Sequence, residues 1–174
     1  KYNLSDLIWT CQHSKKIVPK REQELLALTI TRLVVDLMNN IKRVCVFASS
    51  CNYLDKSYYK TAAEFGKLLA KSGFDMVYGG SSLGLMWACA EQVKLNGKQI
   101  IGVMPEKLYN MGVYTDSCVD LTVTPCMRSR KAKMDELSDA VVALAGGFGT
   151  LEELSEMIVQ KQFGYNNKPI VILN

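Results

Sequence analysis

Ala140-Val141-Val142-Ala143-Leu144-Ala145-Gly146-Gly147-Phe148-Gly149-Thr150-Leu151-Glu152-Glu153 is the stretch that decides the fold. Its first five residues are apolar and indicate a buried strand, and apolar residues then recur at helical spacing at Leu151, Leu154, Met157 and Ile158. Glycines let the backbone approach an anion, and a helix start offers unpaired N–H groups and a positive dipole end. The stretch therefore predicts a strand, a turn and a helix that bind a phosphorylated small molecule, with acidic residues beside the turn for chemistry.

The composition is that of one globular domain. The chain has 174 residues, of which 48% are apolar and 22% charged, with a net charge of +4. The densest basic cluster contains only Arg128, Arg130, Lys131 and Lys133. Four charges on one predicted helix indicate a solvated face, so we expect no nucleic-acid partner.

Cysteine and histidine usage argues against a metal site. The six cysteines show no C-x-x-C spacing, and the chain has a single histidine. Cys45 and Cys89 lie within apolar stretches, so we expect them to be reduced core residues. The sequence shows no secretory signal and no apolar run of transmembrane length, so we expect a cytoplasmic protein without membrane contact.

The two ends of the chain differ from its body. In residues 21–38 the apolar positions fall on one helical face, so residues 1–40 are predicted to form a helical extension that packs on the body or on a partner. Residues 41–174 are predicted to form the nucleotide-binding catalytic domain. The strand-like residues 170–173 stand at the end of the sequence, and a final strand in a wound sheet normally carries a covering helix. We therefore expect a C-terminal helix beyond Asn174 in the full protein.

Strand and helix patterns alternate through the body. Strands are predicted at 43–49, 75–78, 99–103, 119–123, 140–144 and 170–173, and helices at 57–72, 85–95, 127–137 and 150–161; residues 108–117 are predicted to be an irregular connection. Parallel strands need crossover connections, which these helices supply. The pattern predicts an α/β fold, a Rossmann-like doubly wound parallel sheet with helices on both faces.

The conspicuous turns all follow predicted strands. They are 48–52, 79–84, 125–130 and 146–150, and ligands of open parallel sheets bind outside the carboxyl ends of the strands. Taken alone, the 79–84 loop could be a plain tight turn. A nicotinamide cofactor site would require G-x-G-x-x-G after the first strand, whereas the 79–84 loop follows the second strand and has a different glycine spacing. The Walker pattern of nucleoside triphosphate hydrolases is absent from the sequence. Two glycine loops, the arginines and the carboxylates should instead converge on one site.

Thr150 and Glu153 have an alternative explanation as a capping box, in which both side chains satisfy amides at the helix end. The glycines before Thr150 are unfavourable in that case, unless their backbone freedom is used. A helix dipole gives an exposed anion only about 0.3–1 kcal/mol, whereas hydrogen bonds to charged groups contribute roughly 1.5–3 kcal/mol each. A phosphate site would therefore need the loop amides and an arginine, and Arg128 and Arg130 are the available ones.

Four segments, at 78–86, 127–134, 138–140 and 146–153, together resemble the Lonely Guy family of cytokinin-activating nucleoside 5′-monophosphate phosphoribohydrolases, often labelled lysine decarboxylase-like. The family motif P-G-G-x-G-T-x-x-E, preceded by an R-K-x-x-M helix, is similar to residues 127–134, 138–140 and 146–153. The family loop Y-G-G-G-x-x-G-L-M is similar to residues 78–86. The resemblance runs in consistent order over residues 42–174 and leaves out residues 1–40.

The resemblance implies a homodimer that hydrolyses the N-glycosidic bond of AMP or a cytokinin riboside monophosphate, giving free base and ribose 5-phosphate without a metal or other cofactor. By position, Arg130 and Glu153 match the catalytic residues. The residues matching the nucleotide and phosphate contacts are Gly79, Gly80, Met127, Lys131, Gly146, Gly147, Gly149 and Thr150. A carboxylate at Glu153 would stabilise positive charge on the ribose and orient water, while Arg130 would hold the substrate and offset charge on the phosphate or departing base.

The sequence departs from the family pattern at two places, and a second function stays open. Ala145 stands in place of the motif's proline, and Cys51 lies where the family usually has a small Gly/Ser loop. The alternative to an enzyme is a non-catalytic carrier or sensor of a phosphorylated ligand, like molybdenum-cofactor carrier proteins. Lysine decarboxylation is disfavoured because no lysine sits in a recognisable pyridoxal-phosphate context.

Overall fold

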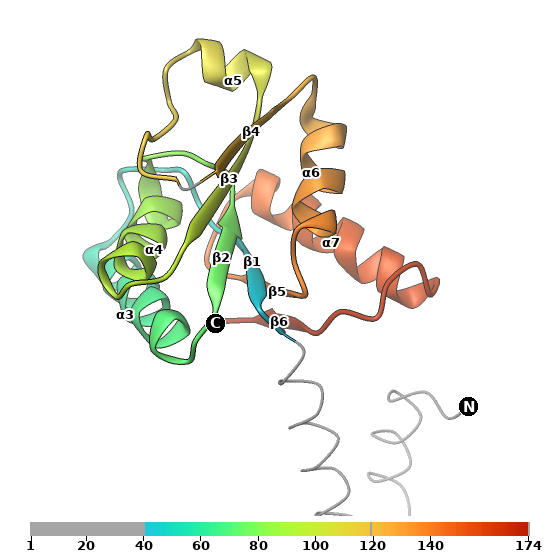
Figure 1. The fold of residues 1–174 in the computed structure, drawn as a ribbon, viewed down its shortest axis with the longest axis horizontal. Helices are drawn as coiled ribbons and strands as arrows, with labels where there is room; N and C mark the ends of the chain where they lie inside the picture. Colours follow the sequence, from blue (N-terminus) through green and yellow to red (C-terminus); the bar gives the residue numbers. More distant parts are fainter. Residues whose placement is uncertain (1–40, 119, 174) are drawn as a thin grey trace, which may run out of the picture. The chain divides into compact units, whose positions relative to one another are not determined.

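The computed structural model describes residues 41–118 and 120–173, which form a six-stranded parallel sheet flanked by helices (Figure 1). The strand order is β4-β3-β2-β1-β5-β6. The strands are β1 (Arg43–Phe47), β2 (Asp75–Tyr78), β3 (Ile100–Pro105), β4 (Asp120–Thr124), β5 (Ala140–Ala143) and β6 (Ile170–Ile172). The predicted α/β Rossmann-like fold is confirmed, whereas the predicted arm at 1–40 lies outside the described residues.

Helices cover both faces of the sheet, as predicted. Side chains alternate along a strand, so Val44 and Val46 of β1 pack on the side of α3 (Lys56–Lys71) and α4 (Gly84–Leu95). Cys45 and Phe47 pack on the opposite side, with α6 (Met127–Glu136) and α7 (Phe148–Gln162) (Figure 1). The central strands β1, β3 and β5 are buried on both faces, so they are mainly apolar instead of alternating with polar residues.

The hydrophobic core on the α3–α4 side of the sheet depends on close packing of α3 against α4. A Cβ atom at Gly66 of α3 would collide with the backbone carbonyl of Cys89 on α4, so only glycine allows this approach. Cys89 is fully buried and Cys45 is almost so, and both are free thiols. The prediction that these two cysteines are reduced core residues is confirmed.

Element boundaries differ from the predictions in two places that affect the site. A short helix α5 (Glu106–Asn110) follows Pro105, where the sequence pattern indicated no regular structure until 117. Helix α7 begins at Phe148 and not at Thr150, because the Gly-Phe-Gly segment joins its first turn. None of the helices in the described part of the chain is both long and apolar enough to cross a membrane.

The direction in which successive strands are added reverses at β1, which lies between β2 and β5. The chain builds β2, β3 and β4 on one side of β1 and then crosses to build β5 and β6 on the other. The loop after β1 is held there by the Ser49 N–H, which donates to Ala145 O at 3.0 Å, and by the Leu85 N–H, which donates to Ser49 O at 2.8 Å. Such a switch point, at the carboxyl ends of the strands, is where wound sheets bind ligands.

Candidate active site

A cavity of about 490 Å³ opens at the switch point. Its wall comes from the loops after β1 and β2, the segment after β3, and the first turns of α6 and α7. Arg130 and Glu153 are the only charged residues of this lining, and its apolar part includes Met86, Met104 and Val113. The volume suits a small molecule, and the lining suits a ligand with an apolar ring and a charged group.

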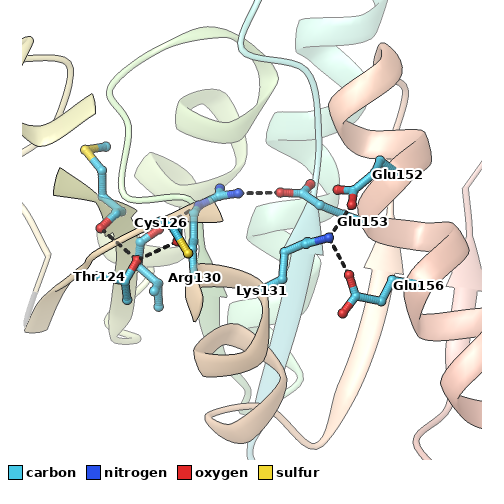
Figure 2. Close-up of polar contacts among 9 residues, drawn as sticks. Thr124, Cys126, Arg130, Lys131, Glu152, Glu153 and Glu156 are labelled. Atoms are coloured by element: carbon cyan, nitrogen blue, oxygen red, sulfur yellow. Dashed lines mark hydrogen bonds and ion pairs between the residues drawn. The ribbon is translucent and has the colours of Figure 1, made fainter. Parts of the chain in front are cut away.

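Arg130 of α6 and Glu153 of α7 meet inside the cavity wall (Figure 2). Arg130 Nη1 lies 2.5 Å from Glu153 Oε1, and the two side chains are only 8% and 9% exposed. Arg130 Nε donates to Val103 O of β3 at 3.0 Å, which fixes the guanidinium from a second direction. The two residues predicted to be catalytic are therefore brought together.

The loop after β2 makes room for this arginine. A Cβ atom at Gly79 would collide with Nη2 of Arg130, so a glycine is required where the guanidinium crosses the strand end. Gly80 has φ +73°, and a Cβ there would lie 2.8 Å from the Leu121 side chain. Gly79 lines the cavity, whereas Gly80 packs behind it and is not part of the lining.

The environment of Glu153 favours its protonated form. Burial raises the pKa of the Glu153 carboxyl above its ordinary value, and the adjacent Arg130 guanidinium acts in the opposite direction. Glu152 adds to the upward shift of this pKa, while Lys131 opposes it. The site thus holds a carboxyl with a raised pKa against a fixed cation, an arrangement typical of acid–base and charge-stabilising sites.

The first turn of α7 presents backbone N–H groups to the cavity. Gly147 is the N-cap residue, and no side chain among residues 41–118 and 120–173 caps the helix. The Leu151 N–H makes the first helical bond, to Gly147 O at 3.0 Å, so the N–H groups of Phe148, Gly149 and Thr150 precede it. Gly147, Gly149 and Thr150 all line the cavity, as expected for an anion-binding turn.

The alternative explanation of Thr150 and Glu153 as a capping box is wrong. Because α7 begins two residues earlier, Thr150 lies inside the first turn, and Glu153 bonds to Arg130 instead of the helix end. Thr150 packs on Gly146, where a Cβ would collide with the threonine hydroxyl. A capping interaction occurs instead at α6, where Ser129 Oγ accepts a hydrogen bond from the Cys126 N–H at 3.2 Å.

Lys131 turns away from the cavity. Its ammonium group forms ion pairs with Glu152 and Glu156 of α7, and the lysine side chain is 12% exposed (Figure 2). Of the predicted nucleotide contacts, Met127 lines the cavity, while Lys131 and Gly146 support it from outside. The lysine therefore joins α6 to α7 beside the Arg130–Glu153 pair.

Sequence reasoning missed one polar residue and part of the apolar wall. Ser81, Met104, Leu108 and Val113 line the cavity but were not singled out. Met104 could have been found from its place near the carboxyl end of a predicted strand. Leu108 and Val113 lie in a segment without periodicity, so no sequence signal identified them. Within residues 41–118 and 120–173, no cluster of three histidine, cysteine or acidic residues could hold a metal ion.

The fold and the cavity define a Rossmann-like protein whose site combines a helix start with a buried arginine–glutamate pair. Residues 86–174, just over half of the chain, match the family model described as "Possible lysine decarboxylase", and the chain belongs to this family. The chain is 41% identical over 138 residues to a probable cytokinin riboside 5′-monophosphate phosphoribohydrolase of Oryza sativa subsp. japonica, an alignment covering 79% of this chain and 55% of the relative.

A second relative is a cytokinin riboside 5′-monophosphate phosphoribohydrolase of Arabidopsis thaliana. It is 39% identical over 140 residues, which are 80% of this chain and 66% of the relative. The resemblance to the Lonely Guy family is thereby confirmed. The chain spans between 55% and 66% of the length of these two relatives. Among solved structures, the Moco carrier protein of Chlamydomonas reinhardtii matches with a TM-score of 0.63 and 26% identity, over 77% of this chain and 76% of that chain.

Proposed function

We propose that this protein is a nucleoside 5′-monophosphate phosphoribohydrolase, acting on AMP or a cytokinin riboside monophosphate. The observation that carries the proposal is the buried Arg130–Glu153 pair, which lies in the same cavity as the uncapped start of α7. The names of the two relatives support the same reaction class. The products are a free base and ribose 5-phosphate.

The start of α7 binds the phosphate. Its first N–H groups point along the helix axis and the helix dipole adds a partial positive charge, so both favour an anion. Gly147 and Gly149 have open space where a side chain would stand, so a phosphate can approach their backbone. The phosphate in turn fixes the position of the ribose relative to Glu153, one helical turn further along α7.

Glu153 acts on the ribose. Its Oε1 is engaged by Arg130, and Oε2 accepts no hydrogen bond from the residues that the structure describes, so this oxygen can face the sugar. The bond between C1′ and the base nitrogen breaks, and its electron pair leaves with the base. Positive charge develops on the ribose, which the carboxylate stabilises. Water held by the carboxylate then adds to C1′, and the proton it releases neutralises the departing base.

Arg130 sets the charge balance of this step. It opposes the effect of burial on the pKa of the Glu153 carboxyl, so this group ionises more readily than burial alone would allow. Its guanidinium also lies beside Gly79, where it can offset negative charge on the phosphate or on the departing base. The guanidinium bonds to Val103 O and Glu153 at the same time through its planar array of N–H donors, which a lysine ammonium does not reproduce.

We also propose a homodimer that uses the outer face of α7. Phe148, Leu151, Ile158, Val159 and Phe163 are exposed on or directly after this helix, most of them at helical spacing. Such an apolar stripe is typical of an interface. Ile158→Glu should give a monomer by light scattering, with Leu68→Glu on α3 as the control that stays dimeric. The assignment of 41–174 as the catalytic domain and the cytoplasmic location stay predictions.

A carrier of a phosphorylated ligand is the second candidate, favoured by the similarity to the Moco carrier structure. One experiment separates the two. Purified protein is incubated with a panel of nucleoside 5′-monophosphates and with the matching nucleosides, and free base is measured by chromatography. The proposal expects base release from a monophosphate and at least 100-fold slower release from its nucleoside. Tight binding of a nucleotide without any base release would favour the carrier.

A further inference from the structure

Ser81 is a cavity residue whose hydroxyl has no hydrogen-bond partner in the part of the chain that the structure describes. It follows β2 in the loop after Gly80, lines the cavity and is 5% exposed. Among the described residues, Ser81 Oγ is the one buried side-chain nitrogen or oxygen atom without a hydrogen bond. Such atoms are rare in native structures, and each needs an explanation.

Two other buried hydroxyls of the domain are satisfied by the fold itself. Thr124 Oγ1 donates to Met104 O at 3.4 Å, and Ser138 Oγ donates to Met134 O at 2.9 Å. Burying a hydroxyl without a partner is unfavourable, and a smaller apolar residue at position 81 would avoid it. The serine is therefore explained best if its partner arrives with the ligand.

The backbone around Ser81 is held in place. Ser81 forms an isolated antiparallel bridge with Tyr114, the Ser82 N–H donates to Val113 O at 3.4 Å, and the Thr115 N–H donates to Gly80 O at 3.1 Å. Val113 belongs to the apolar part of the cavity lining. Ser81 is thus a polar residue fixed beside an apolar wall, and rotation about its Cα–Cβ bond is the freedom left to its hydroxyl.

Strand order separates Ser81 from the start of α7. Ser81 follows β2 and α7 follows β5, with β1 between them. Neighbouring strands lie about 4.8 Å apart, so the two strand ends are roughly 10 Å apart. A nucleotide whose phosphate binds at α7 would therefore extend past Glu153 and bring its base to the β2 side of the cavity.

We propose that Ser81 recognises the base of the nucleotide, its hydroxyl turning into the cavity to make a hydrogen bond with the polar edge of the ring. The proposal rests on the proposed function, because it assumes that the phosphate lies at α7. The ligand class it specifies is a base with a nitrogen or oxygen at that edge, held between apolar side chains such as Met104 and Val113. The contact contributes to the selection of the base and leaves the reaction at C1′ unchanged.

Ser81→Ala tests this contact in the full chain, with Ser82→Ala as a matched control because Ser82 is exposed and outside the lining. For Ser81→Ala, the KM for AMP should rise about tenfold, the typical effect of losing one ligand hydrogen bond. The inhibition constant of ribose 5-phosphate, which has no base, should stay within about twofold of wild type. The Tm of the free protein should stay equal or rise, since an unpartnered hydroxyl is removed. Ser82→Ala should match wild type in all three.

Three results would overturn the proposal. The first is an unchanged KM for AMP, and the second is an equal loss of affinity for AMP and for ribose 5-phosphate. The third is a lowered Tm of the free protein, which would assign Ser81 a structural role. If wild type hydrolyses no nucleotide, the proposed function fails, and calorimetric titration of AMP and ribose 5-phosphate into both proteins still decides the role of Ser81. A tenfold weaker affinity of Ser81→Ala for AMP alone would then support base recognition without catalysis.

Discussion

Arg130 and Glu153 reach each other from two different helices, with the guanidinium Nη1 2.5 Å from the carboxylate Oε1. The pair is buried, and Arg130 is also bonded to Val103 O. Removing one partner of a buried ion pair leaves an uncompensated charge, typically at a cost of about 3–5 kcal/mol, so conservative substitutions are the informative ones.

Arg130→Lys should abolish most activity although it keeps the charge. A lysine cannot donate to Val103 O and Glu153 in the geometry of the guanidinium, so the carboxylate loses its fixed partner. We expect kcat to fall by about 100-fold or more, the effect of losing one preorganised donor. Arg128→Lys, an exposed change on the same helix, should leave kcat near the wild-type value. Equal kcat values for the two variants would contradict the role of Arg130.

The pH dependence of kcat/KM should report Glu153. Below its pKa the carboxyl is neutral and cannot stabilise positive charge on the ribose, so activity should rise as the pH increases through this pKa. Burial raises the pKa of Glu153, so the acid limb should lie above the ordinary range of a glutamate. Initial rates between pH 4 and 8 would measure it, and an acid limb at or below the ordinary glutamate pKa would argue against Glu153.

Lys131→Met should move that acid limb to higher pH. Lys131 lowers the pKa of Glu153, whereas Glu152, its ion-pair partner, raises the same pKa. The substitution removes the lowering effect of Lys131 and leaves the raising effect of Glu152 unopposed. Stability should fall by roughly 1 kcal/mol or less, because Glu152 and Glu156 are partly exposed.

Lys133→Met is the matched control for Lys131→Met. Lys133 pairs with Glu136 on its own helix, at 2.8 Å. Its loss should leave the acid limb in place. If Lys131→Met binds AMP more weakly with the acid limb unmoved, direct contact with the nucleotide would be the better explanation, as the family resemblance implied.

Gly146→Ala and Gly149→Ala should separate support of the turn from contact with the phosphate. A methyl group at 146 collides with Thr150, so unfolding in urea should show a loss of about 1–3 kcal/mol. A methyl group at 149 meets open space and removes a glycine from a helix, so stability should rise by about 0.5–1 kcal/mol. The KM for AMP should nevertheless increase in Gly149→Ala. An unchanged KM there would place the phosphate elsewhere.

The main features of the fold and the meeting of Arg130 with Glu153 could be predicted from the sequence. Apolar runs separated by helical patterns predict parallel strands, and parallel strands bring the residues that follow them to one edge of the sheet. Both residues follow such strands, so their convergence required no knowledge of side-chain packing.

The remaining details depend on contacts that the pattern does not contain. The early start of α7 at Phe148 runs against the low helix propensity of glycine, so the sequence pattern did not indicate it. The direction of Lys131 depends on where Glu152 and Glu156 lie on the neighbouring helix. The unpartnered hydroxyl of Ser81 could be recognised only once every nearby donor and acceptor had been placed.

The most direct test of the account compares Glu153→Gln with Glu152→Gln in a single-turnover assay of base release from AMP. Glutamine keeps the size of both side chains, and Glu152 is the exposed neighbour that bonds to Lys131. We expect Glu153→Gln to release base at least 100-fold more slowly than wild type while still binding AMP, and Glu152→Gln to stay within a few-fold of wild type. Base release by Glu153→Gln at the wild-type rate would contradict the proposed role of Glu153.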